Sequence, residues 1–404
     1  MSASTLRGAR LALLFMLPAF GCGAAQAPVL APPSCPEPEP EPEPRPEPTS
    51  VADPAFADDW AATSGFRAGQ PASITITPSG DAVLFLRSGP RDGLRQLYSF
   101  EVDTGEERLL LTAEQVLQGA EEELSDEERA RRERLRLAAR GITRFELSPD
   151  GSKILVPISG RLFVVDRGTG AVRELPGEGG YADDPHFSPN GEFVACVRAG
   201  DLYAIRLADG RQRRLTRTAN AHRRNGMPEF VAQEEMQRYR GFWWAPDSSA
   251  ILYQQTDTEG VEILHASDPI HPERPARAAP YPRAGRSNAV VRLALVPLVR
   301  GPQRWFEWDR ELYPYLATVR WKAQGLLVLV QNRSQTREAL LRFDPSTGEH
   351  RELLVEEDAA WLNLDQSVPA FVGDDGAFLW SSERSGEWEL ELRRADGSLD
   401  RVIA

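Results

Sequence analysis

Residues 148–166 read SPDGSKILVPISGRLFVVD, and residues 188–207 read SPNGEFVACVRAGDLYAIRL, so one pattern recurs after about 40 residues. Each copy opens with a Ser-Pro-x-Gly turn, which is followed by two apolar runs of strand length with a tight turn between them. A period of about 40 residues is that of one four-stranded blade in a β-propeller. These two stretches therefore predict an all-β propeller rather than a helical or mixed fold.

The same pattern extends in both directions along the chain. Related turns begin at Thr77 and Ala245, and the apolar runs AVLFLR (82–87) and AILYQQ (250–255) follow them. A fifth unit covers about 312–356, and a sixth begins near Pro369. We therefore predict about six blades of four strands each, together with two helical insertions that interrupt the period.

The first insertion, residues 121–140, reads EEELSDEERARRERLRLAAR. Ser125 and Glu128 have the spacing of a capping box, and acidic residues precede arginines as a helix dipole favours. We predict a charged helix here. On its composition alone, it is a solvated surface helix.

The second insertion, about 217–241, carries the adjacent acids Glu234 and Glu235 within PEFVAQEEMQRYRGFWWAPD (228–247). Neighbouring side chains on a strand point to opposite faces, so both carboxylates face one ligand only from a helical turn or a bend. Two carboxylates at one place repel each other unless a cation lies between them, which suits a bound ammonium group. The alternative is a solvated Glu-Glu pair on a surface helix.

The run FVAQEEMQRYRGFWWAPDSSAILYQQTDTEGVEILHASDP (230–269) resembles the N-terminal β-propeller of the dipeptidyl peptidase IV family, in particular its dipeptidyl peptidase 8/9-like and bacterial branches. The similarity extends from about Phe66 to the last residue. In that family, paired glutamates clamp the free N-terminal amine of a peptide substrate. The resemblance implies this role for Glu234 and Glu235, with Xaa-Pro or Xaa-Ala peptides as ligands. It also implies eight blades in a complete propeller, and homodimers are common among family members.

The resemblance also assigns a role to the charged insertion. A helix of this composition in related peptidases carries an arginine that contacts the backbone carbonyl of the substrate. The position that matches best is Arg132, and Arg131 and Arg134 are the alternatives.

Catalysis in the family belongs to a C-terminal α/β-hydrolase domain, whose serine lies in a G-x-S-x-G motif beside Asp and His. This sequence has no such motif, and GRSNA (285–289) comes nearest to it. We assign no catalytic residue. We expect a substrate-gating propeller that is truncated before its hydrolase and inactive alone, unless a separately encoded hydrolase completes it. The alternative is a surface-tethered propeller lipoprotein that binds peptides or proteins.

The amino terminus has the pattern of an export signal. Residues 1–22 combine basic residues, an apolar core (11–20) and Cys22, which is the expected lipidated residue of a lipoprotein signal peptide. Cleavage after AQA (25–27) is the alternative. Residues 23–50 form a Pro/Glu-rich linker, in which PEPEPEPEPRPEP favours an extended rod. We therefore expect an exported periplasmic or outer-membrane-anchored protein with its propeller in residues 51–404.

The overall charge narrows the possible partners. The chain has 60 Asp and Glu against 47 Lys and Arg, a formal net charge of −13. No basic patch dominates, so nucleic acid is not an expected partner. The three cysteines and five histidines show no metal-ligand spacing, and we expect neither a metal nor a cofactor.

Overall fold

A computed structural model describes residues 53–178 and 180–404. The predicted signal peptide (1–22) with Cys22 and the whole of the predicted linker (23–50) lie outside these residues. The chain divides into two units, Met1–Asp53 and Pro54–Ala404, and the second contains all the helices and strands described below. No helix in the described ranges is long and apolar enough to cross a membrane.

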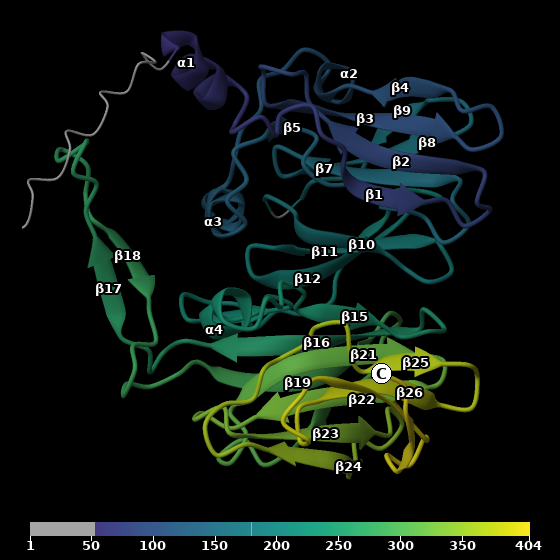
Figure 1. Cartoon of the computed structure of the whole chain (residues 1–404), viewed down its shortest axis with the longest axis vertical. Helices are drawn as coiled ribbons and strands as arrows, with labels where there is room; N and C mark the ends of the chain where they lie inside the picture. The colour runs from purple at the N-terminus through teal and green to yellow at the C-terminus, as the bar shows by residue number, and fades with distance from the viewer. Residues whose placement is uncertain (1–52, 179) are drawn as a thin grey trace, which may run out of the picture. The chain divides into compact units, whose positions relative to one another are not determined.

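Six sheets of four or five strands follow one another along the described chain, and we number them as blades 1 to 6 (Figure 1). Blade 1 has β1 (Ala72–Ile76), β2 (Ala82–Arg87), β3 (Leu94–Glu101) and β4 (Glu107–Leu111), and β5 (Arg140–Gly141) pairs with β3. Blade 2 has β6 (Glu146–Leu147), β7 (Lys153–Ile158), β8 (Arg161–Asp166) and β9 (Val172–Glu174). Blade 3 has β10 (Asp183–Phe187), β11 (Phe193–Arg198), β12 (Asp201–Arg206) and β13 (Gln212–Arg214).

The second half of the chain continues the series. Blade 4 has β14 (Arg223–Asn225), β15 (Phe242–Trp244), β16 (Ala250–Asp257), β19 (Val290–Pro297) and β20 (Arg304–Phe306). Blade 5 has β21 (Tyr315–Lys322), β22 (Gly325–Gln331), β23 (Arg337–Phe343) and β24 (His350–Glu357). Blade 6 has β25 (Ala370–Val372), β26 (Ala377–Ser382), β27 (Glu389–Arg393) and β28 (Leu399–Val402).

The recurring Ser-Pro-x-Gly turn explains where the second strand begins in blades 2 and 3. The Ser148 hydroxyl donates to the Asp150 carboxylate (2.5 Å) and accepts from the backbone N–H of Lys153 (2.9 Å), which is the first residue of β7. Ser188 makes the same two contacts, with Asn190 (2.7 Å) and with the N–H of Phe193 (3.0 Å), the first residue of β11. The turn side chain therefore positions the start of the strand that follows.

The core lies between the blades. Alternate residues of each strand face opposite sides, so every inner blade buries one apolar face against the preceding blade and the other against the next. Leu84 and Ile154 meet in the cluster between blades 1 and 2, and Leu155 and Val194 meet in the cluster between blades 2 and 3. Three further clusters join blades 3 and 4, 4 and 5, and 5 and 6. This packing is that of a β-propeller and confirms the predicted fold class.

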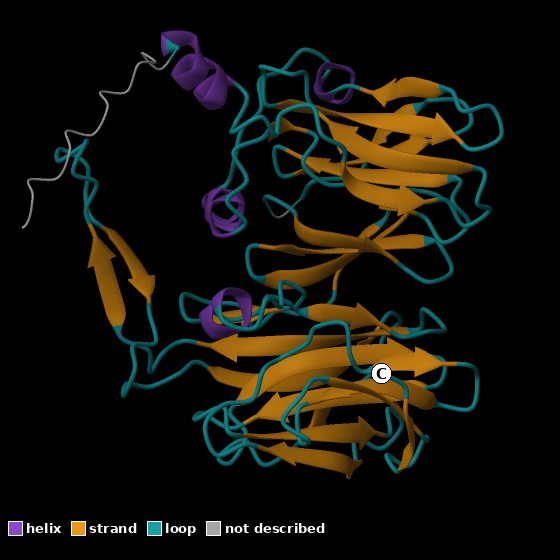
Figure 2. Cartoon of the chain, viewed as in Figure 1, coloured by secondary structure: helices purple, strands orange, loops and turns teal. Residues whose placement is uncertain are grey.

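Helices are few among the described residues (Figure 2). They are α1 (Pro54–Ala62), α2 (Ala113–Leu117), α3 (Asp126–Arg134) and α4 (Phe230–Glu234). The charged insertion forms α3, which is shorter than the 20 residues of the insertion. The Ser125 hydroxyl accepts from the N–H of Glu128 (3.0 Å), but the Glu128 carboxylate binds arginines instead of closing the capping box.

A two-stranded hairpin was not anticipated by the sequence pattern. β17 (Ile263–Ala266) and β18 (Arg277–Pro280) pair only with each other and leave blade 4 between β16 and β19 (Figure 1). These strands were not predicted because the sequence around them is rich in proline, and proline within a run argues against strand structure. The hairpin is therefore an addition to the blade repeat.

Candidate functional site

α4 fixes the direction of the two adjacent glutamates. Val231 and Met236 are buried in the apolar cluster between blades 5 and 6, whereas Glu234 and Glu235 are exposed. The helix ends at Glu234, and Glu235 is its C-cap residue, so both carboxylates leave the same final turn. The prediction that this segment is a helical turn is confirmed, and its buried side chains anchor the turn in the core.

A buried polar network lies at the base of α4. Glu229, the N-cap residue, makes no capping bond and instead accepts from Gln254 and from the Arg238 guanidinium (3.4 Å). Arg238 also donates to Gln254 (2.7 Å) and to the backbone carbonyls of Leu316 (3.0 Å) and Arg240 (2.8 Å). Burial lowers the pKa of Arg238, and the Glu229 charge opposes this shift. The network ties the ends of the α4 segment to blades 4 and 5.

α3 reaches the glutamates from the other insertion. Arg134 Nε lies 2.7 Å from Glu234 Oε1, and Arg134 Nη1 lies 3.2 Å from Gln233 Oε1. In Figure 1, α3 and α4 face each other on one side of the sheets. The Glu235 carboxylate has no partner within residues 53–178 and 180–404. One member of the pair is therefore neutralised by a cation, and the other is available to a ligand.

Arg132 and Arg131 have different neighbours. Arg132 is 7% exposed and binds Glu122 (2.6 Å) and Glu128 (2.8 Å). Arg131 also binds Glu128 (2.8 Å). Burial alone would raise the pKa of Glu128, but the hydrogen bonds from the two arginines outweigh it and hold the pKa at about 2. Arg132 thus fastens α3, and its substrate-binding role stays a prediction.

The sequence alone does not show which of the three arginines of α3 reaches the glutamates of α4. They lie within four residues on a helix without a broad apolar stripe, so no local pattern separates the one that reaches α4. The contacts place Arg134, one of the alternatives, beside Glu234, which is 100 residues away in the chain.

A histidine-centred cluster was also missed. His186 Nδ1 lies 2.5 Å from Glu146 Oε2, and Nε2 lies 2.9 Å from Asp184 Oδ1. Burial would lower the pKa of His186, but the two carboxylates raise it above its ordinary value. Arg240 Nη2 approaches the same ring to 2.7 Å. Scattered single histidines gave no sequence signal for this cluster. Within the described ranges, no group of three or more His, Cys, Asp or Glu residues has the arrangement of a metal site.

Comparisons with known proteins agree on one family. The family model for the dipeptidyl peptidase IV (DPP IV) N-terminal region matches residues 148–403. Dipeptidyl peptidase 8 of Mus musculus is 27% identical over 286 residues, covering 61% of this chain and 32% of the relative. The Homo sapiens protein of that name is 26% identical over 261 residues, covering 55% and 29%. The chain thus spans about a third of the length of these curated relatives.

A solved structure supports the fold independently. The crystal structure of Porphyromonas gingivalis dipeptidyl peptidase 4 superposes with a TM-score of 0.68 at 19% sequence identity. The match covers 85% of this chain and 48% of that one. At this identity, the likeness concerns the fold alone.

Proposed function

Because the chain belongs to the dipeptidyl peptidase IV family and contains its N-terminal propeller region, we propose that α4 binds the free amino terminus of a peptide and so selects substrates by that terminus. The proposal rests on one observation above all. Two carboxylates leave one anchored turn, and one of them, Glu235, has no partner among the described residues. A terminal ammonium carries three N–H donors and matches such a site.

Arg134 would provide a second contact to the bound peptide, in addition to the contact between Glu235 and the amine. Its guanidinium lies against Glu234, so it stands at the edge of the space that a bound amine would occupy. In the proposed complex, Arg134 donates to a peptide carbonyl while Glu235 accepts from the amine. Charge-assisted hydrogen bonds of this kind contribute on the order of 1.5–3 kcal/mol each. Two such contacts distinguish a peptide amino terminus from a free amine.

We assign no step of hydrolysis to the described residues. In the proposed arrangement, this region positions the peptide, and an α/β-hydrolase domain supplies the serine nucleophile and its base. That domain belongs either to the whole protein or to a separately encoded chain. The proposed contribution of the propeller is orientation, which lowers the entropic cost of bringing the scissile bond to the nucleophile.

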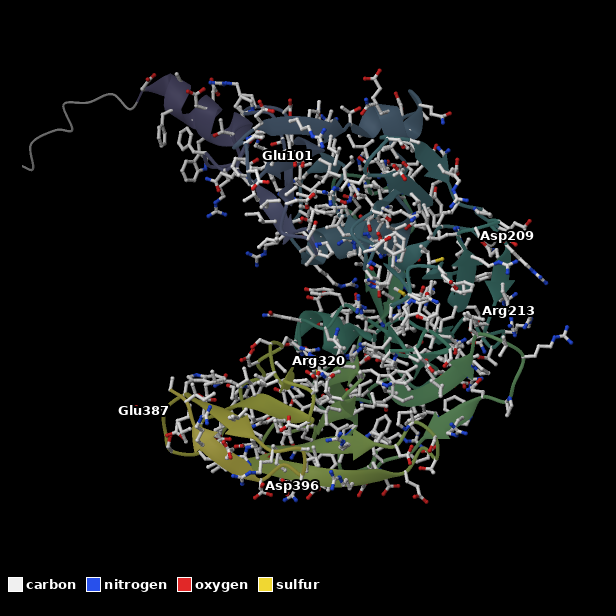
Figure 3. The ribbon with its side chains drawn as sticks, turned by 90° about the vertical axis from the view of Figure 1, so that its right-hand side faces the viewer. Glu101, Asp209, Arg213, Arg320, Glu387 and Asp396 are labelled. Carbon is white, nitrogen blue, oxygen red and sulfur yellow. The ribbon has the colours of Figure 1, made fainter. Side chains whose placement is uncertain are left out.

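The amine site is tested by the binding of an Xaa-Pro peptide in two forms, with a free and with an acetylated amino terminus. We expect the free form to bind and the acetylated form to bind much more weakly, because acetylation removes the positive charge. Glu235→Gln should weaken binding of the free form by about tenfold, which corresponds to ~1.4 kcal/mol. Glu387→Gln serves as the matched control, since Glu387 is exposed on blade 6 (Figure 3). Equal affinity of the wild type and Glu235→Gln for the free peptide would discard the proposal.

A further inference from the structure

A cavity of about 780 Å³ opens where strands of four successive blades approach one another. Its lining comes from β6, β10, β15 and β21, together with residues 237–240, which connect α4 to β15. Pockets that bind small molecules have volumes of about 300–1,000 Å³, so this cavity has the size of a ligand site. It is distinct from the exposed carboxylates at the end of α4, neither of which lines it.

The charge of the lining is opposite to that of the protein. Arg240, Arg320 and Lys322 line the cavity, although the whole chain has a formal net charge of −13. Glu146 is the lining carboxylate, and it is already bound to His186. A local excess of basic groups in an acidic protein concentrates anions at that place.

Four basic side chains belong to the lining, and one of them, Arg238, pairs with Glu229. Of the other three, Arg240 has a carboxylate near it, since its charge lowers the pKa of Asp184. None of Arg240, Arg320 and Lys322, however, forms a direct ion pair with a carboxylate in residues 53–178 or 180–404. Arg320 donates instead to the backbone carbonyls of Val319 (3.3 Å) and Gln366. Burial lowers the pKa of Arg320, and the positive charge of Arg240 lowers it further, against an opposing effect of Asp365. Holding the like charges of Arg240 and Arg320 near each other costs free energy, which an anionic ligand between them would offset.

Aromatic side chains complete the lining. Tyr239, Trp243 and Trp321 belong to the same cavity lining. Trp321 directly follows Arg320 (labelled in Figure 3) in β21, so it projects from the opposite face of that strand. A guanidinium presents planar pairs of N–H donors that match the two oxygens of a carboxylate. Aromatic walls beside such donors suit an organic ligand with apolar parts better than a small inorganic anion.

We propose that this cavity is a second binding site, which takes the carboxylate groups of an acidic peptide, with Arg240, Arg320 and Lys322 as the anion-binding residues. The proposal does not depend on the amine site, because the two use opposite charges and different residues. A peptide with a blocked amino terminus binds at the cavity alone. The sites are therefore separable by experiment.

The test uses the full chain and a short peptide of Asp, Glu and Gly that is acetylated at its amino terminus and amidated at its carboxyl terminus. The control peptide replaces Asp and Glu with Asn and Gln, so it keeps the shape and loses the charge. Binding is followed by intrinsic fluorescence, since Trp243 and Trp321 line the cavity, and by calorimetry. The acidic peptide should bind, and its affinity should fall as salt rises.

The variant that tests the site is Arg240→Gln combined with Lys322→Gln, because Arg320 also holds backbone carbonyls. We expect this double variant to bind the acidic peptide at least about tenfold more weakly. Arg300→Gln, which removes an exposed charge without a described ion-pair partner, should bind like the wild type. Glu235→Gln should also bind like the wild type, and this result separates the cavity from the amine site. An unchanged melting temperature establishes that the double variant is folded.

Several results would overturn the proposal. If the wild type and the double variant have equal affinity for the acidic peptide, Arg240 and Lys322 do not bind its carboxylates. If the acidic peptide and its Asn/Gln control bind equally well, the cavity does not recognise carboxylates. If the acidic peptide does not bind at all, the cavity is not a binding site for it. Inorganic phosphate is the remaining probe. If phosphate displaces the acidic peptide at equal concentration, the cavity is a small-anion site and the peptide assignment is wrong.

Discussion

Glu338 is a buried carboxyl group whose pKa is raised well above its ordinary value. It lies in β23, in register with Gln331 on one side and Glu356 on the other. Burial and the charge of Glu356 raise the pKa of Glu338 to about 8. The Glu356 carboxylate accepts from Trp380 (3.0 Å) and Ser382 (3.0 Å) of blade 6, which hold it at the interface between the two blades. A proton on Glu338 therefore removes a repulsion between neighbouring strands.

This residue makes stability depend on pH in a defined direction. Between the ordinary pKa of 4.5 and about 8, the folded chain holds a proton that the unfolded chain has released. The free energy of unfolding should fall with rising pH in this window, by about 1.4 kcal/mol per pH unit from this group, and level off above it. Denaturant titrations at several pH values should show this slope in the wild type and lose it in Glu338→Gln. Glu387→Gln should keep the slope, and identical slopes in all three proteins would contradict the assignment.

At the scale of the element, the strands were more predictable than the insertions. β2 begins and ends at the predicted residues because an apolar run with a turn at each end defines it locally. The α4 turn was predictable from its two acids. The partner of Glu234 was not, because a contact across 100 residues leaves no trace in one sequence. The same reason hid the cluster around His186, whose members come from blades 2, 3 and 4.

The Glu128 carboxylate stabilises α3 through ion pairs within the helix, which leads to a prediction. Glu128 binds Arg131 and Arg132, and its pKa of about 2 means that this support is present above pH 4.5 and is lost as pH falls towards 2. Glu128→Gln should therefore speed amide hydrogen exchange in α3 while leaving the blade strands protected. Glu133→Gln is the matched control on the same helix, since Glu133 is exposed. Unaltered exchange in Glu128→Gln would show that other contacts hold the helix.

At the scale of the whole molecule, the first blade presents an apolar face that no described residue covers well. Ile74 and Ile76 in β1 are 65% and 68% exposed, and Phe100 and Leu109 of the same blade are also exposed. None of the five apolar clusters joins blade 6 to blade 1. Exposed strands with apolar side chains favour association between molecules.

We therefore expect the chain to self-associate through this face. The double variant Ile74→Thr with Ile76→Thr should reduce concentration-dependent light scattering and change the free energy of unfolding by less than about 0.5 kcal/mol per site, as is usual for exposed positions. Leu84→Thr is the contrasting variant, because Leu84 is fully buried in the neighbouring strand and its loss should destabilise the fold. Scattering that is unchanged in the β1 double variant would locate the association elsewhere.

The contact between Arg134 and Glu234 also has a consequence for the order of events during synthesis. A ribosome adds the helix that carries the arginine long before it adds the turn that carries the glutamate, and two complete blades, 2 and 3, are made in between. The nascent arginine is therefore without this partner at first, and the surface proposed to bind a peptide forms only when the fourth blade emerges. A chain that stops before residue 234 contains blades 2 and 3 but lacks the glutamates of the proposed amine site.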